Sequence, residues 1–172
     1  MTPQVEYSVD IARKLNKVLQ LNNVAFAGLE AQLNRFGGPP FKFALKLNTV
    51  RWTTSENELL GAFPVTVNIQ DGDSDDLASL SVLIRTTHAI CDELTIEGRE
   101  AVPHYLGIVG WMQVWPYVRA EIQSLSTKLG FPPLTLPVIL TGQTRHVPVE
   151  HLDEVASEGE PGVDEGISLI SD

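Results

Sequence analysis

The chain has 172 residues, of which 43% are hydrophobic, and a formal net charge of −10. This length suits one domain that buries about two-thirds of its unfolded surface. No apolar run approaches the ~18 residues of a membrane-spanning helix, so membrane insertion is not expected. The N-terminus carries Glu6 and Asp10 instead of a basic patch before an apolar stretch, so we expect no secretory signal. The single cysteine, Cys91, excludes an intramolecular disulfide, and these features together predict a cytoplasmic protein.

The negative charge is concentrated at the C-terminus. Residues 149–172 hold eight acidic side chains and no Lys or Arg, which leaves 14 acidic and 12 basic residues elsewhere. Because this remainder is nearly neutral, no basic face is expected to contact phosphates, and nucleic-acid binding is disfavoured. We therefore predict a folded domain over residues 1–148 and an acidic, disordered tail over residues 149–172. Contact with a basic partner and simple solubilisation both remain open for this tail.

The first half of the chain predicts a helix and then strands. Ser8 is a plausible N-cap for a short helix over Val9–Lys17. A strand should follow over residues 19–34, and its apolar residues change phase at Gly28, as a bulge would require. Further strands are predicted over residues 41–48, 63–70 and 77–94, with a polar break at residues 53–56 between the first two and a hairpin loop at residues 71–76 between the last two.

Strand faces follow from the alternation of apolar residues. We expect Phe63, Val65, Val67 and Ile69 to point inward. Pro64, at an outward position, predicts an edge strand or the start of a strand, since proline cannot donate a ladder hydrogen bond.

The second half predicts two helices. Pro103 can open a first helix near residues 105–111, and a main helix follows from about Met112. Its apolar stripe is Val114, Val118, Ile122, Leu125 and Leu129. Pro116 suits the first turn, Gly130 suits the left-handed position after the last turn, and Pro132 and Pro133 prevent continuation. The fold class is therefore α+β: a four-stranded antiparallel sheet with a short N-terminal helix and two C-terminal helices packed on one side.

No catalytic or metal site is predicted, and no cofactor is expected. The loop from Asp71 places acids at the first, third and fifth positions of a calcium loop, but the sixth and twelfth positions are wrong. The segment from His146 to His151 matches no zinc-ligand spacing, and we interpret it as a linker into the tail. Cys91 and His104 could form a nucleophile and base, but no cysteine-enzyme motif surrounds Cys91, which we expect to be a small buried residue.

Aromatic residues are the remaining candidates for a function. Most could simply form the core, but Phe36 and Phe41 flank a Gly-Gly-Pro-Pro loop and need not be buried. Aromatic side chains offer large contact area without reading a sequence, which suits promiscuous binding of apolar segments. The residues predicted to line such a peptide-binding groove are Phe36, Phe41, Trp52, Trp111, Trp115 and Tyr117, with Leu125 and Leu129 as its floor.

Three short motifs, in order, resemble the SecB family of protein-export chaperones. The first is His104, Leu106 and Gly107; the second is Pro116, Tyr117, Arg119 and Ile122; the third is Gly130, Phe131, Pro132, Leu134 and Leu136. The resemblance covers roughly residues 18–140. It implies a four-stranded α+β protomer, assembly into a homotetramer as a dimer of dimers, and ATP-independent holding of unfolded polypeptides in apolar grooves. By the same resemblance His104, Gly107, Arg119 and Gly130 are structural, as helix packing, an anchor and a cap.

Two departures bear on the partners. Export members deliver clients to the motor SecA through acidic residues on the outer sheet face, where this chain has Asn23, Ala27 and Leu83. The N-terminal helix instead resembles divergent SecB-like chaperones that guard antitoxins of toxin–antitoxin systems. A dedicated chaperone or adaptor for one partner, such as an antitoxin, is therefore the alternative to a general holdase. A small-molecule enzyme using the same apolar pocket is the third possibility.

Overall fold

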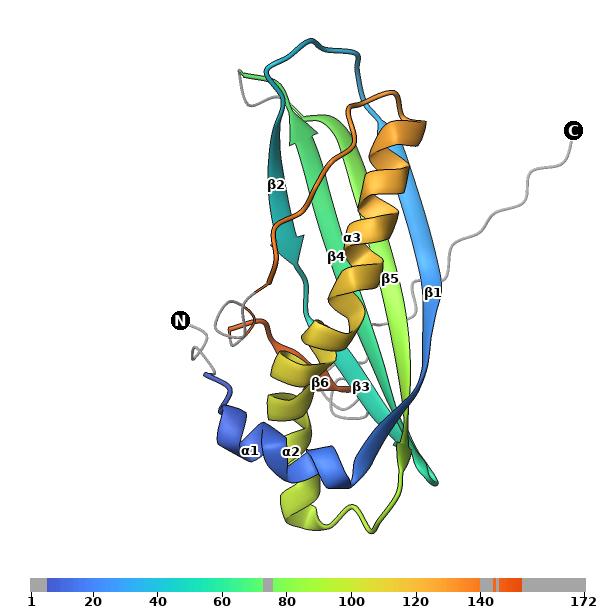
Figure 1. Ribbon diagram of the computed structural model, residues 1–172, viewed down its shortest axis with the longest axis vertical. Coiled ribbons are helices and arrows are strands. Elements are labelled where there is room, and N and C mark those ends of the chain that lie inside the picture. The colour runs from blue at the N-terminus through green and yellow to red at the C-terminus, as the bar shows by residue number, and fades with distance from the viewer. Residues whose placement is uncertain (1–5, 73–75, 140–143, 145, 153–172) are drawn as a thin grey trace, which may run out of the picture.

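The computed structural model describes residues 6–72, 76–139, 144 and 146–152. Helices and strands follow one another in the order shown in Figure 1. They are helix α1 (Val9–Lys14), the 3-10 turn η1 (Leu15–Lys17), strands β1 (Leu19–Leu33), β2 (Lys42–Leu47), β3 (Val50–Ser55), β4 (Glu58–Gln70) and β5 (Asp76–Ile90), helix α2 (Ile96–Tyr105), the π-helical turn η2 (Leu106–Gly110), helix α3 (Trp111–Lys128) and strand β6 (Val149–His151). The α+β class and the N-terminal helix are confirmed.

Within the described residues the sheet has six strands, two more than expected. The order is β1-β5-β4-β3-β6, and β2 also pairs with β4. Strand β4 therefore meets β3 along its first part and β2 along its second. The polar residues from Thr53 onward, interpreted as a break, belong to β3, and the turn falls at Glu56 and Asn57. A short strand with a solvated face carries too few apolar residues to be recognised from sequence.

Strand β6 corrects the interpretation of its residues as a linker. It pairs parallel with β3, with Val149 beside Val50 and His151 beside Trp52. The backbone nitrogen of Val50 also donates to the carbonyl of Pro148 at 2.8 Å. The folded body thus continues past residue 148, and most of the predicted tail, residues 153–172, lies outside the described residues.

The helices cover one face of the sheet (Figure 1). Phe63, Val65, Val67 and Ile69 of β4 are all buried on that inner face, as predicted. Their neighbours Leu80, Val82 and Ile84 on β5 are buried beside them, and the apolar stripe of α3 packs onto both strands. The outer face of the same strands is only partly buried, and the sequence therefore alternates between apolar and more polar residues along them.

Two prolines occupy other positions than expected. Helix α2 begins at Ile96, where the Thr95 side chain accepts a hydrogen bond from the nitrogen of Gly98 at 3.2 Å, so Pro103 lies inside the helix instead of opening it. Pro116 is the sixth residue of α3. It lies on the exposed face with Met112, whose carbonyl can bond to solvent where the proline offers no donor.

Strand irregularities were only partly foreseen. The register between β1 and β5 shifts between Phe26 and Gly28, which confirms the bulge. Pro64, however, is not on an edge strand, because β4 has neighbours on both sides. Its carbonyl accepts from the nitrogen of Asn48, in the connection between β2 and β3, so the missing N–H faces a gap in the ladder.

Among the described residues, no helix combines the length and the hydropathy needed to cross a membrane.

Candidate functional site

Helix α3 ends in a turn that reverses the chain onto the sheet. Gly130 has a φ of +85°, in the left-handed region that glycine adopts without a steric cost. Its nitrogen donates to the carbonyl of Thr127, and the nitrogen of Phe131 donates to the carbonyl of Ser126, both at 3.0 Å. These two bonds are the pattern of a Schellman motif, so the predicted role of Gly130 as a cap is confirmed.

Residues 131–139, here called the exit segment, run back beside β2 (Figure 1). Side chains of α3 fix this segment by three hydrogen bonds. The nitrogen of Leu134 donates to Ser126 Oγ at 3.0 Å. Arg119 Nε donates to the Leu136 carbonyl at 3.0 Å, and Trp115 Nε1 donates to the Pro137 carbonyl at 2.9 Å. The predicted anchor role of Arg119 is confirmed. Three prolines in the segment lack an N–H, so it is held in place without becoming a strand.

An apolar cleft of about 350 Å³ lies between the exit segment and the sheet. On one wall the rings of Phe41 and Phe131 meet edge to face, with centroids 5.4 Å apart. Phe43 lies opposite Ile69 in the register of β2 and β4, and its side chain remains 41% exposed. The complete lining is Phe41, Lys42, Phe43, Ile69, Phe131, Pro132, Pro133, Leu134 and Thr135. One charged residue among nine makes this a site for apolar groups.

The cleft lies beside strand β2, whose free edge can form hydrogen bonds with another strand. Within the described part of the chain, β2 pairs only with β4, so its second edge keeps unpaired N–H and C=O groups. An extended peptide can add to such an edge through its main chain while alternate side chains enter a neighbouring pocket. The arrangement therefore suits an extended apolar segment better than a compact small molecule.

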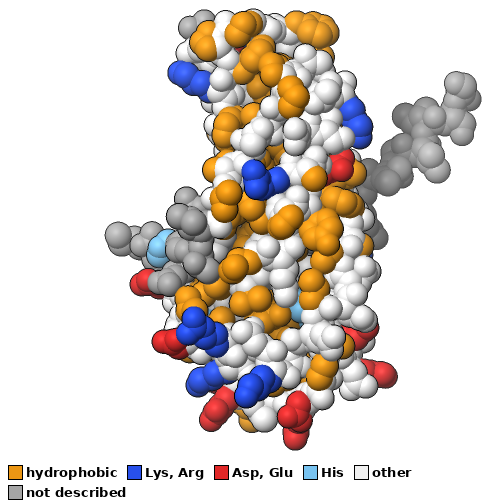
Figure 2. All heavy atoms as spheres, in the orientation of Figure 1, with side chains coloured by type: hydrophobic (Ala, Val, Ile, Leu, Met, Phe, Trp, Pro, Cys, Tyr) orange, Lys and Arg blue, Asp and Glu red, His pale blue; other side chains and the backbone are white. Residues whose placement is uncertain are grey.

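A second apolar surface lies on the inner face of β1. The register with β5 places Val24, Phe26 and Leu29 on the same face as the core. Helix α3 packs on β5 and β4, however, and leaves Phe26 45% and Leu29 48% exposed. Figure 2 shows hydrophobic side chains over much of this face of the molecule. Among the strands that the structure describes, β1 also ends the sheet, so apolar side chains and an unpaired edge again occur together.

The structure separates the eight predicted groove residues into two sets. Phe36 (86% exposed), Phe41, Tyr117 and Leu129 are at least partly accessible. Trp52, Trp111, Trp115 and Leu125 are buried in the hydrophobic core of the chain. Only Phe41 lines the apolar cleft, so the structure does not bring the eight together in one groove. The role of the accessible residues in binding stays a prediction.

The buried tryptophans have structural contacts. Trp111 meets Phe63 edge to face at 5.2 Å, and Trp52 lies against His151 with ring centroids 4.3 Å apart. Sequence reasoning missed Phe43 and Leu134 as cleft residues. The alternation of residues 41–47 gave the face of Phe43, but nothing in the sequence showed that the exit segment would stop short of covering it.

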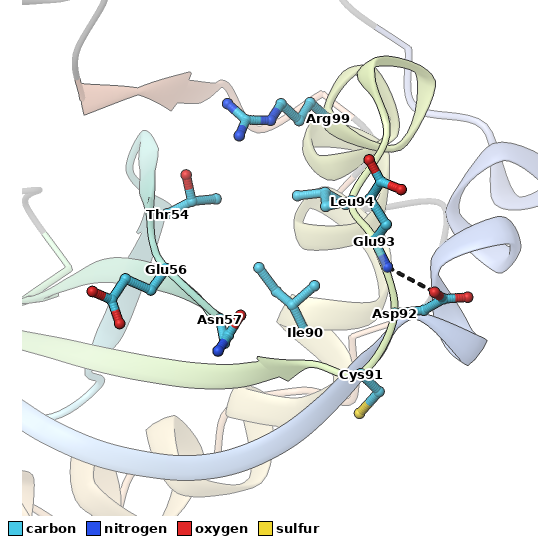
Figure 3. A pocket seen from close by; sticks show the side chains of 9 residues that line it. All are labelled: Thr54, Glu56, Asn57, Ile90, Cys91, Asp92, Glu93, Leu94 and Arg99. Atoms are coloured by element: carbon cyan, nitrogen blue, oxygen red, sulfur yellow. Dashed lines mark hydrogen bonds between the residues drawn. The ribbon is translucent and has the colours of Figure 1, made fainter.

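A larger cavity, of about 610 Å³, offers no convergent chemistry. It lies where β5 leads into α2, and its lining includes Glu56, Asp92, Glu93 and Arg99 (Figure 3). Asp92 accepts a hydrogen bond from the nitrogen of Glu93 at 2.8 Å, and the side chains around the opening do not point to a common centre. Among the described residues no cluster of three or more metal-ligating side chains is found.

Cys91 and His104 do not form a nucleophile and base. Cys91 is exposed just after β5, which corrects the expectation that it is buried. His104 Nδ1 accepts a hydrogen bond from the nitrogen of Ser8 at 2.9 Å, and its ring meets that of Tyr7 edge to face. A Cβ on Gly107 would lie 2.4 Å from the Tyr7 ring, so this glycine permits the close approach. His104 and Gly107 are thus structural, as predicted.

The antiparallel-rich sheet with helices on one face matches a SecB-like α+β fold. Among solved structures, the fold is shared by the Mycobacterium tuberculosis SecB-like chaperone Rv1957, in complex with a ChAD peptide from the Rv1956 HigA1 antitoxin, with a TM-score of 0.65. The two sequences are 19% identical, and the match covers 76% of this chain and 97% of that one. The predicted likeness to divergent SecB-like proteins is confirmed at the level of the fold.

Other comparisons add little. A protein of unknown function from Streptococcus agalactiae matches with a TM-score of 0.32 and 10% identity, over 70% of this chain and 97% of that one, which is too distant to support an argument. No protein-family model and no curated protein matches the sequence.

Proposed function

We propose that this protein is an ATP-independent cytoplasmic chaperone that binds unfolded polypeptides in an apolar groove and performs no catalysis. The observation that carries the proposal is the cleft between β2 and the exit segment, which is apolar, accessible and adjacent to an unpaired strand edge. A holdase needs only to bind the unfolded client, because mass action then lowers the concentration free to aggregate. The aromatic rings of Phe41 and Phe131, which pack against each other in the cleft, supply contact area without sequence selectivity.

A specific observation favours a dedicated form of this function. The structurally similar Rv1957 is described in complex with an antitoxin peptide. The second candidate is therefore a chaperone for a single partner such as an antitoxin, which would use the same cleft. Co-purification from the native cell, followed by mass spectrometry, separates the two: one stoichiometric partner supports the dedicated form, and many substoichiometric partners support the general one.

The outer face of the sheet argues against delivery of clients to SecA. Asn23 and Leu83 lie on the outer sheet face, by the register of β1, β5 and β4, and carry no acidic group there. Arg51 and Arg85 lie on the same face, by the register of β3, β4 and β5, so the positions beside Leu83 carry cations and not an acidic cluster. Direct titration with purified SecA tests this part of the proposal, and saturable binding would restore an export role.

The holdase proposal is tested by light scattering from an aggregating, unrelated client without nucleotide. The full-length protein should suppress scattering at a several-fold molar excess. Phe43→Ser should weaken suppression, because Phe43 is a partly exposed cleft residue whose removal costs little packing. Ile96→Ser is the matched control, since Ile96 is 80% exposed on α2 and distant in sequence from every cleft residue. Absence of suppression by the native protein would contradict the proposal.

A further inference from the structure

The outer face of the sheet has a cleft of its own, of about 730 Å³. Its floor is apolar and includes Pro64 and Leu83, from the central strands β4 and β5. Around that floor are three exposed cations, Lys46, Arg51 and Arg85. This outer cleft is separate from the apolar cleft, which lies on the inner face.

The three cations of the outer cleft, Lys46, Arg51 and Arg85, form no ion pair within the described part of the chain. Glu150 is adjacent to Arg51 in the register of β6 and β3, but the two form no ion pair. No acidic residue lines the cleft. Like charges gathered on one surface repel one another, so an anionic occupant would be favoured by relief of that repulsion as well as by direct attraction.

The chain itself supplies a segment of the required charge at the required place. Leu152, the last residue that the structure describes, lines the outer cleft. Residues 153–172 follow it directly and contain seven acidic residues with no Lys or Arg. An extended chain covers roughly 3.3 Å per residue, and Leu152 lines the same cleft as the three cations, so acidic residues that follow it within a few positions are within reach of the cleft. Tethering also gives the segment an effective concentration on the order of millimolar, which a free acidic peptide rarely reaches.

We propose that the acidic segment 153–172 binds in the outer cleft of the same chain, with its carboxylates at Lys46, Arg51 and Arg85. This gives the C-terminal charge a specific contact in place of general solubilisation. The proposal is independent of the chaperone function, because it concerns the opposite face of the sheet.

The test measures binding of a fluorescent synthetic peptide, with the sequence of residues 153–172, to full-length proteins by anisotropy. In one variant the seven acids of the segment are replaced by the corresponding amides, which preserves its length. This variant should bind the peptide at least about tenfold more tightly than the native chain, in which the tethered segment competes. The affinity should fall with added salt, since the Debye length is only about 8 Å at physiological ionic strength.

Charge reversal identifies the site. Adding Arg51→Glu and Arg85→Glu to the amide variant should abolish peptide binding, whereas Arg13→Glu with Lys14→Glu, two exposed cations of α1, should leave it unchanged. Thermal melting verifies folding, and Arg51→Gln with Arg85→Gln replaces the reversal if the stronger change unfolds the protein. Equal affinity of the native chain and the amide variant, no binding to either, or binding unaffected at Arg51 and Arg85 would each overturn the proposal.

Discussion

Trp115 connects the hydrophobic core to the proposed binding cleft. Its ring is 4% exposed, while its indole nitrogen donates to the Pro137 carbonyl in the exit segment. A buried indole N–H needs a partner, and a segment rich in proline has carbonyls to offer but few donors. One side chain thereby packs the inner face and fixes one wall of the cleft.

We expect Trp115→Phe to preserve most of the packing and to lose this hydrogen bond. An intramolecular hydrogen bond makes a net contribution of about 1 kcal/mol to stability, so the free energy of unfolding should fall by at least roughly that amount. The smaller phenylalanine ring fills less of the core and adds to the loss. Denaturant unfolding measures it. Client suppression should fall as well, since the exit segment is less well held. Unchanged stability would show that the indole contact is not a restraint.

His88 makes stability depend on pH. It is buried on the inner face, and its Nε2 lies 2.9 Å from Gln113 Oε1, which requires the proton on that nitrogen. Burial lowers the pKa of His88 below its ordinary value. The folded state therefore favours neutral His88, and stability should be lost as pH falls through the unfolded-state pKa of about 6.5.

We predict a decline in the free energy of unfolding between about pH 7.5 and 5.5, with a smaller decline in His88→Gln, which cannot titrate. Chemical denaturation across this range measures both slopes. Burial also lowers the pKa of His104, so some dependence should remain in the variant. Identical slopes for the two proteins would exclude His88 as a source.

At the scale of elements, the end of α3 decides where the exit segment goes. The Schellman turn at Gly130 reverses the chain, and Ser126 then bonds both the helix, through the Gln123 carbonyl, and the nitrogen of Leu134. A helix that continued further would carry residues 131–139 past the sheet. The cleft therefore depends on the few residues that end helix α3 at Gly130.

Gly130→Ala should lower the free energy of unfolding by about 1–2 kcal/mol, because a side chain disfavours the left-handed conformation. Nothing lies within 4 Å of the added Cβ, so the effect is conformational and not a clash. Gly38→Ala is the matched control: its Cβ also meets nothing and its φ is not positive, so its stability should be unchanged or slightly raised. A loss of equal size at both positions would contradict this explanation.

At the scale of the whole molecule, the inner face of β1 leaves apolar side chains exposed. Half-exposed Phe26 and Leu29 beside an unpaired edge are costly for an isolated protomer, and joining another copy would cover both. We propose that the protein forms the dimer of dimers that its resemblance to SecB implies, with β1 in one of the interfaces.

Phe26→Glu should shift the protein to smaller species in sedimentation velocity, because it places a charge in an apolar contact. Ala25→Glu, one residue away on the opposite face of β1, is the control and should leave the distribution unchanged. A native protein that sediments as a monomer at all concentrations would contradict the assembly, and unchanged assembly of Phe26→Glu would exclude β1 from the interface.

The sequence by itself determined the features whose causes are local. Alternation assigned the faces of β4 and β5, the apolar stripe gave α3, and the glycines at 28 and 130 marked a bulge and a helix end, because each follows from backbone geometry over a few residues. The short strands β3 and β6 were missed, since they exist through pairing with distant residues.

Tertiary structure alone decided which aromatic residues are accessible. Trp111 and Phe43 look equally suited to a groove, but α3 carries the first into the core and the exit segment leaves the second at the rim. Exposure depends on what the rest of the chain covers, and that is set by long-range packing.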